Sequence, residues 1–427
     1  MTDAHLPSID ERLAAAGLPP LPRGAWLEID LDALEGNLAA LRTLAGGAPV
    51  YPVVKADAYG HGAVPVAIAL ESAGADGLCV ATIDEAVALR NGGLRGLIRV
   101  LYPIPPAYAA DAADRRISVA AGDRETLRRL LDAATEAGVG VRGRARLGVE
   151  LEVETGLGRG GANPDVIAAM ARTIQLSTAA DLVGLWTHLQ ASEDPSITAR
   201  QLERFEAASI AIGAAGLDLP PRHVASSGGL LTDVAAFDGV RPGLSVYGIL
   251  PDELAGGALA GTDSTAGLRP VMSLHARPVR VADLPPGHGI SYGPTFTTTT
   301  PSRIATLPLG YGDGYARANS NRASALVRGG RAPLVGNVAM DALMVDVTDV
   351  PGPPVDVDDE FVLLGSQGAD RIRPEDLALT RTTNTWEVVT QMSGRLPRVY
   401  HAAAGAVGLR TLAGWSGAIG THRTLER

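Results

Sequence analysis

The chain has 427 residues, 46% of them hydrophobic and 20% charged, which is the balance of a globular protein with one large or two medium domains. A net charge of −10 argues against nucleic acid or an anionic membrane surface as the main partner. The single cysteine, Cys79, excludes an intrachain disulfide and a cysteine-based metal cluster, and we predict no metal site.

The N-terminal residues 1–24 are polar and punctuated by proline, and they lack the apolar stretch of a signal peptide. No later segment approaches the run of apolar residues that spans a bilayer. We therefore expect a polar N-terminal tail on a cytoplasmic protein that does not contact membranes.

A short strand at 25–31 leads into a helix at about 32–44, and a βα alternation follows. Eight candidate strands lie at 50–54, 77–81, 98–102, 117–121, 143–149, 182–189, 223–226 and 240–248. Helical patterns fill the gaps, because apolar residues recur there every three or four positions. This alternation predicts a (β/α)8 barrel over residues 25–252, with an open doubly wound sheet as the competing layout.

The composition changes after Pro251. Residues 253–267 read as a linker of small residues, and alternating apolar and polar residues then predict antiparallel strands. We expect a second, mostly antiparallel β domain over residues 268–412, with which the first strand near 25–31 packs. Residues 285–302 carry no formal charge and are rich in Pro, Gly and Thr, which predicts a loop at a functional edge.

The basic residues include a single lysine. Lys55 stands alone among 37 basic residues, of which the other 36 are arginine. Arginine cannot lose its proton at working pH, whereas a buried lysine can become a free amine, act as a base or condense with a carbonyl. A lysine kept where arginine serves elsewhere therefore indicates such chemistry, and an exposed lysine left by chance is the alternative.

Polar residues gather at the carboxyl ends of five predicted strands, where the site of a parallel barrel lies. They are Lys55, Arg159, His188, Ser227 and Arg241. A lone amine beside glycines whose backbone N–H groups can cradle a phosphate suggests covalently held pyridoxal phosphate.

Seven motifs in this order closely resemble those of the alanine racemases: VVKADAYGHG, ETGLGRGG, THLQAS, RPGLSVYG, GISYGPTF, LPLGYGDGYAR and VAMDALMVDVTD. The resemblance runs from about Ala25 to Tyr400. It implies a pyridoxal phosphate enzyme built from a barrel and a β domain, a homodimer with shared active sites, and a role in supplying D-alanine for peptidoglycan.

The resemblance also implies roles for individual residues. Lys55 would hold the cofactor and act as the base on one face of a small amino-acid substrate, and the partner subunit's Tyr292 would act on the opposite face. Racemisation needs such a pair, because the proton leaves one side of Cα and returns on the other. The remaining implied site residues are Tyr59, Ser227, Gly243 and Leu244 for the cofactor phosphate, His188 and Arg241 for its ring, and Arg159, Met340 and Tyr311 for the substrate.

The sequence departs from the commonest family pattern at several of these places. Glu152 stands where relatives often carry a carbamylated lysine, and we expect its carboxylate to brace Arg159. Gly394 replaces a tyrosine that contacts the phosphate in many relatives. Ser226 replaces an asparagine and Ala339 a cysteine, which leaves a shifted substrate range open.

Three alternative functions remain open on the sequence. The first is a racemase of the same family for another amino acid, such as serine. The second is a decarboxylase of the same fold type, although such relatives usually have a cysteine in the second domain, whereas Cys79 lies in the barrel. The third is a non-catalytic pyridoxal phosphate carrier, which would be a lone barrel.

Overall fold

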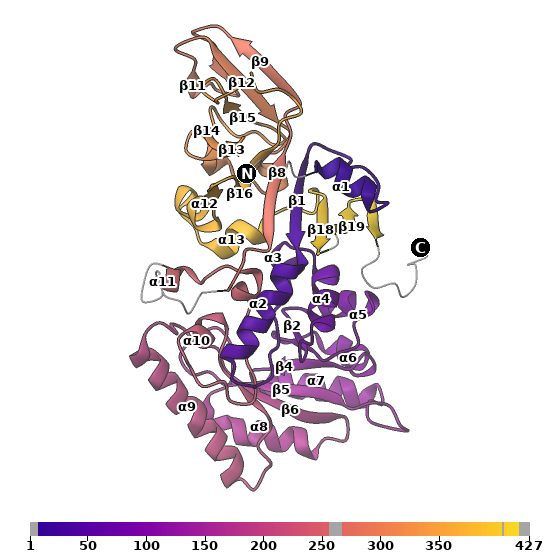
Figure 1. The fold of residues 1–427 in the computed structure, drawn as a ribbon. Helices are drawn as coiled ribbons and strands as arrows, with labels where there is room; N and C mark the ends of the chain where they lie inside the picture. Colours follow the sequence, from indigo (N-terminus) through magenta and orange to yellow (C-terminus); the bar gives the residue numbers. More distant parts are fainter. Residues whose placement is uncertain (1–6, 256–266, 404, 418–427) are drawn as a thin grey trace. The chain divides into compact units, whose positions relative to one another are not determined.

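The computed structural model describes residues 7–255, 267–403 and 405–417 and divides into two compact units (Figure 1). The barrel unit comprises residues 35–58 and 63–268, and the β unit comprises residues 1–34, 59–62 and 269–427. Most of the predicted linker, at residues 256–266, lies outside the described residues. Over the ranges given above, the structure holds no helix with both the length and the apolar character to cross a bilayer.

The barrel unit contains a ring of parallel strands. Its sheet runs in the order β2-β3-β4-β5-β6-β7, with bounds Leu78–Val80, Ile98–Val100, Ile117–Ala121, Leu147–Glu152, Ala180–Trp186 and Arg222–His223. Parallel bridges from Val53 to Cys79, from Val50 to Val240 and from Ser226 to Arg241 close the ring. The predicted barrel followed by a β domain is therefore confirmed. The segments at 50–54 and 240–248 join the ring through isolated bridges and not as regular strands.

Helices alternate with these strands along the chain. They are α2 Leu31–Leu44, α3 Lys55–Tyr59, α4 Ala63–Ser72, α5 Ile83–Asn91, α6 Ala109–Asp114, α7 Arg124–Glu136, α8 Pro164–Leu176, α9 Pro195–Ala214, α10 Ser227–Leu231 and α11 Asp252–Ala255. Asp123 caps α7 and Asp194 caps α9, each by accepting a backbone N–H of the first turn. Leu127, Leu130 and Leu131 of α7 are buried at the spacing of one helix face.

The β unit is built on a large sheet in the order β14-β13-β16-β8-β1-β18-β19-β20, with β17 on β16. The first strand of the chain lies inside it, since β1 pairs antiparallel with β8 and parallel with β18. The bounds are β1 Ala25–Asp30, β8 Met272–Ala276, β13 Ser324–Val327, β14 Gly330–Pro333, β16 Phe361–Gln367, β17 Asp370–Ile372, β18 Arg398–Ala402, β19 Gly405–Thr411 and β20 Gly414–Gly417.

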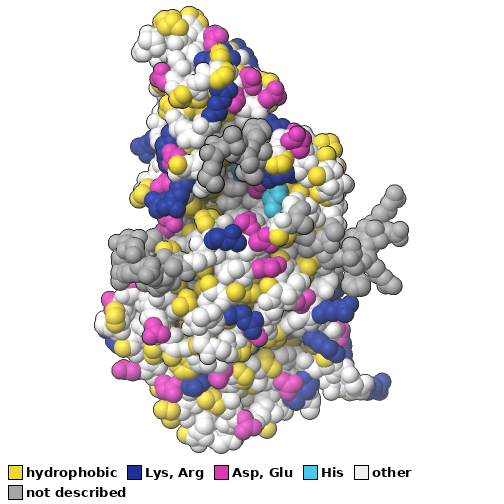
Figure 2. Space-filling view, viewed as in Figure 1, with side chains coloured by type: hydrophobic (Ala, Val, Ile, Leu, Met, Phe, Trp, Pro, Cys, Tyr) yellow, Lys and Arg dark blue, Asp and Glu magenta, His cyan; other side chains and the backbone are white. Residues whose placement is uncertain are grey.

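Smaller elements complete the β unit. A three-stranded sheet contains β15 Leu343–Asp346, β12 Ser302–Leu307 and β9 Arg280–Leu284, and a hairpin pairs β10 Gly289–Ile290 with β11 Phe296–Thr297. The helices are α1 Ile9–Ala15, α12 Pro374–Arg381 and α13 Thr385–Thr390. On the face shown in Figure 2, basic and acidic side chains are interspersed.

Helix α1 docks on the large sheet through apolar packing and two ion pairs, Arg12 with Glu28 and Asp10 with Arg277. Its Ile9 and Leu13 pack in a core cluster that includes Trp26 of β1. The Arg12 guanidinium donates two hydrogen bonds of 2.7 Å to the Glu28 carboxylate. Burial alone would raise the pKa of the Glu28 carboxyl, but hydrogen bonds from His401 and Arg12 outweigh it and hold that pKa well below its usual range.

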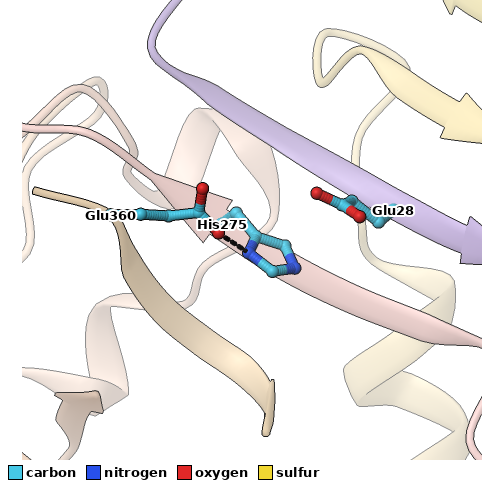
Figure 3. Close-up of side chains that lie close together, drawn as sticks. All are labelled: Glu28, His275 and Glu360. Carbon is cyan, nitrogen blue, oxygen red and sulfur yellow. Dashed lines mark hydrogen bonds and ion pairs between the residues drawn. The ribbon is translucent and has the colours of Figure 1, made fainter. Parts of the chain in front are cut away.

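Glu28 also lies near two other titratable side chains of this sheet, His275 and Glu360 (Figure 3). His275 Nδ1 is 2.8 Å from Glu360 Oε1, and its Nε2 is 2.7 Å from the Ser273 hydroxyl. Both ring nitrogens thus have protein partners, and Arg12 already supplies a positive charge to Glu28. Each of the three side chains is therefore engaged by a protein group of the β unit.

We predict that Glu28→Gln lowers the free energy of unfolding by about 2 kcal/mol at pH 7, because a partly buried charged hydrogen-bond acceptor is lost. The pKa of Glu28 is depressed in the folded state, so its stabilisation is complete above the unfolded value of 4.5 and declines as the pH falls below it. Urea unfolding of both proteins from pH 7 to pH 3.5 measures this. A difference that grows on acidification would contradict the assignment.

Candidate active site

Lys55 begins a short left-handed turn at the end of the barrel segment 50–54. The next four residues, Ala56 to Tyr59, have φ between 52° and 55°, although none is glycine. Each such residue costs about 1–2 kcal/mol, so the turn needs external support. Part of it comes from Glu85, which accepts the Ala56 N–H at 2.7 Å, and from Asp57, which accepts the Ala63 N–H at 2.8 Å. Such strain concentrates at functional sites.

The Lys55 amine lies in an environment that favours its neutral form. Burial and then the positive charge of Arg159 lower its pKa, and these effects outweigh the opposing pull of Glu85. Within the described part of the chain the amine has no hydrogen-bond or ion-pair partner. An amine with a lowered pKa and no engaged partner is suited to act as a nucleophile or a base.

Arg159 lies between an acidic and an aromatic side chain. Its Nη2 is 3.9 Å from Glu152 Oε1, and its guanidinium lies over the Tyr102 ring at 5.5 Å. Burial raises the pKa of Glu152 to about 7, because it outweighs the attraction of Arg159. Arg159 is 38% exposed, so its guanidinium is accessible to an anionic ligand.

Arg241 is buried and held by carbonyl groups at the ends of two strands. Its Nη2 donates to the carbonyl of Thr187 at 2.8 Å, and its Nη1 donates to the carbonyl of His223 at 2.8 Å. Its Nε has no acceptor among the described residues and is the remaining donor. Next to Thr187, burial and the charges of Arg241 and Arg159 lower the pKa of His188 to about 3, so this imidazole is neutral.

Arg241 also belongs to a buried network with three residues that the sequence analysis did not single out, namely His223, Glu150 and Arg99. Arg241 Nη1 also contacts His223 Nδ1, and His223 Nε2 is 3.0 Å from Glu150 Oε2. Arg99 pairs with Glu150 at 3.0 Å. Burial and Arg241 lower the pKa of His223 to about 4, so the ring is neutral and its Nδ1 accepts from Arg241. Its Nε2 contacts both Glu150 Oε2, at 3.0 Å, and Arg99 Nη1, at 2.6 Å.

A pattern in β5 could have revealed this network. Glu150 and Glu152 are two apart in an otherwise apolar strand, and residues two apart in a strand share one face. Both side chains are buried. The sequence reasoning used only Glu152, because it followed the resemblance and not the period of the strand.

Ser227 organises a cluster of backbone donors. Its hydroxyl oxygen accepts the N–H groups of Gly243 at 2.9 Å and Ser245 at 3.2 Å, and Leu244 between them is buried. The fully buried Ser245 hydroxyl has no hydrogen-bond partner within the described ranges. Both N–H groups already donate to Ser227, so the unsatisfied donor in this cluster is the Ser245 hydroxyl. This hydroxyl, the Lys55 amine and Arg241 Nε are donors that fit the phosphate, the aldehyde and the ring nitrogen of pyridoxal phosphate.

Four predicted site residues belong to the β unit. Tyr59 is buried, whereas Tyr292, Tyr311 and Met340 are 81%, 45% and 53% exposed. The Tyr311 N–H donates to the carbonyl of Ala339 at 3.0 Å, so the segments that carry Tyr311 and Met340 lie together. Asn337 donates to the Tyr292 carbonyl at 2.8 Å, which ties the Tyr292 loop to the same region.

Comparisons with known proteins show which family this chain resembles. The family described as "Alanine racemase, N-terminal domain" matches residues 29–251, and "Alanine racemase, C-terminal domain" matches residues 271–400. The alanine racemase of Symbiobacterium thermophilum is 40% identical over 381 residues, which cover 88% of this chain and 97% of that protein. The alanine racemase of Thermobifida fusca is 39% identical over 385 residues, 89% of this chain and 98% of that protein.

Solved structures show the same similarity across both units. Alanine racemase from Bacillus anthracis with bound L-Ala-P aligns with a TM-score of 0.83 at 29% identity, covering 92% of this chain and 99% of that chain. Alanine racemase from Streptomyces lavendulae aligns with a TM-score of 0.80 at 35% identity, covering 90% and 98%. Because both family domains match in order and the relatives align over nearly their whole length, this chain belongs to the alanine racemase family.

Proposed function

We propose that the protein is a pyridoxal phosphate-dependent alanine racemase that interconverts L- and D-alanine in the cytoplasm and supplies D-alanine for peptidoglycan. The observation that carries the proposal is the only lysine of the chain. Its side chain is half-buried, its amine is unengaged by the described residues, its pKa is lowered, and two arginines, Arg159 and Arg241, lie close enough to affect the charges of this site.

The barrel unit would hold the cofactor and one face of the substrate. Lys55 would attach the cofactor, and Arg241 Nε would donate to its ring nitrogen. As the resemblance implies, Tyr59, Ser227 and the backbone of Gly243 and Leu244 would bind its phosphate. When bound, pyridoxal phosphate makes the Cα–H of an attached amino acid acidic. An arginine stays protonated, so it leaves the ring nitrogen neutral, which favours return of the proton to Cα over other reactions.

The proton transfers would use two bases. The Lys55 amine moves the proton on one face of Cα, and the phenol of the partner subunit's Tyr292 moves it on the other. Arg159 binds the substrate carboxylate, helped by the partner subunit's Met340 N–H, and the partner subunit's Tyr311 narrows the entrance. Large exposed side chains such as Tyr292 and Met340 support this assignment, since a partner would cover them in a dimer.

The competing functions are less well supported. Burial raises the pKa of the Cys79 thiol to about 12, so it is a poor proton donor, and it lies in the barrel. The second family domain, at residues 271–400, is what a lone-barrel carrier would lack. A racemase for another amino acid is distinguished by assaying both enantiomers of alanine and serine with chiral separation of the products.

We predict that the cofactor attaches to the only lysine side chain. The chain has two amines, the Lys55 side chain and the N-terminus, so borohydride reduction of the loaded enzyme should fix the cofactor on the peptide that contains Lys55. Mass spectrometry of the digest locates it. Lys55→Arg keeps the charge but cannot condense with the cofactor, and it should give no labelled peptide. Label confined to the N-terminus would refute the proposal.

We predict that each active site needs residues of both subunits. Lys55→Ala and Tyr292→Phe chains should each be nearly inactive, and subunit exchange between them should restore about a quarter of wild-type activity. Half of the dimers are then hybrids, and each has one intact site of two. Racemase assays during exchange test this, with each variant exchanged against itself as the control. Complete exchange without recovery would show that both bases come from one chain.

The raised pKa of Glu152 predicts a pH dependence of substrate binding. Its carboxylate braces Arg159 only when ionised, so the KM for alanine should rise as the pH falls through about 7. Glu152→Gln should show the high KM at all pH values, with cofactor affinity nearly unchanged. Glu152→Lys should be impaired without carbon dioxide and partly restored by bicarbonate, which rebuilds an anion there. A wild-type pH profile in Glu152→Gln would make Glu152 a bystander.

A further inference from the structure

A buried carboxylate lies next to the segment that carries Tyr311. Asp313 is fully buried in the β unit. It accepts hydrogen bonds from Arg23 Nη1 at 2.6 Å and Arg23 Nη2 at 3.1 Å, and also from the Gly310 N–H at 3.1 Å. Arg23 Nη2 also donates to the carbonyl of Pro308 at 2.6 Å. The bidentate Arg23 thus fixes the Asp313 carboxylate, and it connects Pro308 and Asp313 on either side of Tyr311.

This turn is clamped to the segment that carries Met340. Besides the bond from Tyr311 to Ala339, the Gly312 N–H donates to the carbonyl of Met340 at 2.9 Å. Any side chain at Gly310 would collide with the carbonyl oxygens of Ala339 and Met340, so glycine permits the close approach. Two backbone segments far apart in sequence therefore lie in direct contact.

Arg395 ties both segments together through charge. Its Nη2 donates to Asp341 Oδ1 at 2.7 Å, and its Nε is 3.6 Å from Asp313 Oδ1. Asp341 follows Met340 directly, whereas Asp313 ends the 3₁₀ turn Tyr311–Asp313. The Ser393 N–H donates to the Asp313 carbonyl at 3.0 Å, so the segment carrying Arg395 is itself attached to the turn.

We propose that Asp313 and Arg395 are positioning residues that hold Tyr311 and Met340 as one rigid pair, with Arg23 as the buried counter-charge. The inference rests on the proposed function, in which these two residues complete the partner's substrate site. Neither Asp313 nor Arg395 touches the substrate in this account. They act by preventing the Tyr311 and Met340 segments from moving independently, so that both groups are held ready to bind the substrate.

The test uses Arg395→Met in the full-length, cofactor-loaded enzyme. Arg395 is 41% exposed, so the fold should tolerate the change. We expect faster hydrogen exchange in peptides covering residues 308–314 and 337–342, and a KM for alanine raised about three- to fivefold, with kcat within about twofold of wild type. Asp341→Asn, which removes only the charge of the bridge, should act in the same direction.

The matched control is Arg331→Met. Arg331 is 46% exposed and pairs with Asp370 at 2.7 Å in the same unit, and it also donates to the Arg371 carbonyl, so its partners lie outside both segments. It should leave the exchange of the two peptides and the KM unchanged. Asp313→Asn, which removes the buried charge, should raise the KM by about tenfold if it folds. If Arg395→Met matches Arg331→Met in exchange and in KM, the inference is wrong.

A further variant separates this inference from the proposed function. Tyr311→Ala removes the side chain but leaves the clamp of backbone hydrogen bonds. If it leaves the KM unchanged, the proposed substrate role of Tyr311 fails, and the positioning role fails with it. If Tyr311→Ala raises the KM and Arg395→Met does not, only the positioning role fails.

Discussion

Closure of the parallel ring is the constraint on which the candidate site depends. Main-chain hydrogen bonds from Tyr51 to Val240 and from Val53 to Pro242, of 2.8 and 2.9 Å, join the first barrel segment to the last. Closure brings Lys55, at the end of the first segment, to the same rim as Arg241, in the last. In an open sheet these segments would be opposite edges, and a shared amine and guanidinium site would not form.

The charges inside the ring are arranged so that each has a compensating group. Arg241 donates to carbonyl oxygens and to a neutral histidine, and the negative charge of Glu150 is balanced by Arg99. Burial of unpaired charges would cost several kcal/mol each, so this network is a condition for placing a guanidinium at the barrel centre. Lys55 is the exception, because its amine has no described partner and its pKa falls instead. The same burial that makes the pairs necessary favours the neutral form of the Lys55 amine.

The β unit shows the complementary situation, in which the proposed site residues are exposed and the residues that support them are buried. Tyr292 is 81% exposed, whereas Asp313 beneath the Tyr311 turn is fully buried. The N-terminal segment is part of this support, since Arg23 pairs with Asp313 and Arg12 pairs with Glu28. A residue range predicted as a polar tail therefore contains two arginines that hold the unit together. Composition could not show this, because a polar residue in a tail and one in a buried pair look alike in sequence.

The sequence alone was sufficient for the fold class, and it singled out Lys55 as the candidate reactive group. Strand and helix periods are local properties, and a single lysine among 37 basic residues is visible without any structure. Only the tertiary structure decided what surrounds these residues. The left-handed turn after Lys55 contains no glycine, so the sequence gives no sign of it. The turn is stabilised by a hydrogen bond to Glu85, which is distant in sequence. The pairing of Arg241 with His223 and the raised pKa of Glu152 likewise depend on burial and on through-space charge. These quantities arise only when distant segments pack together.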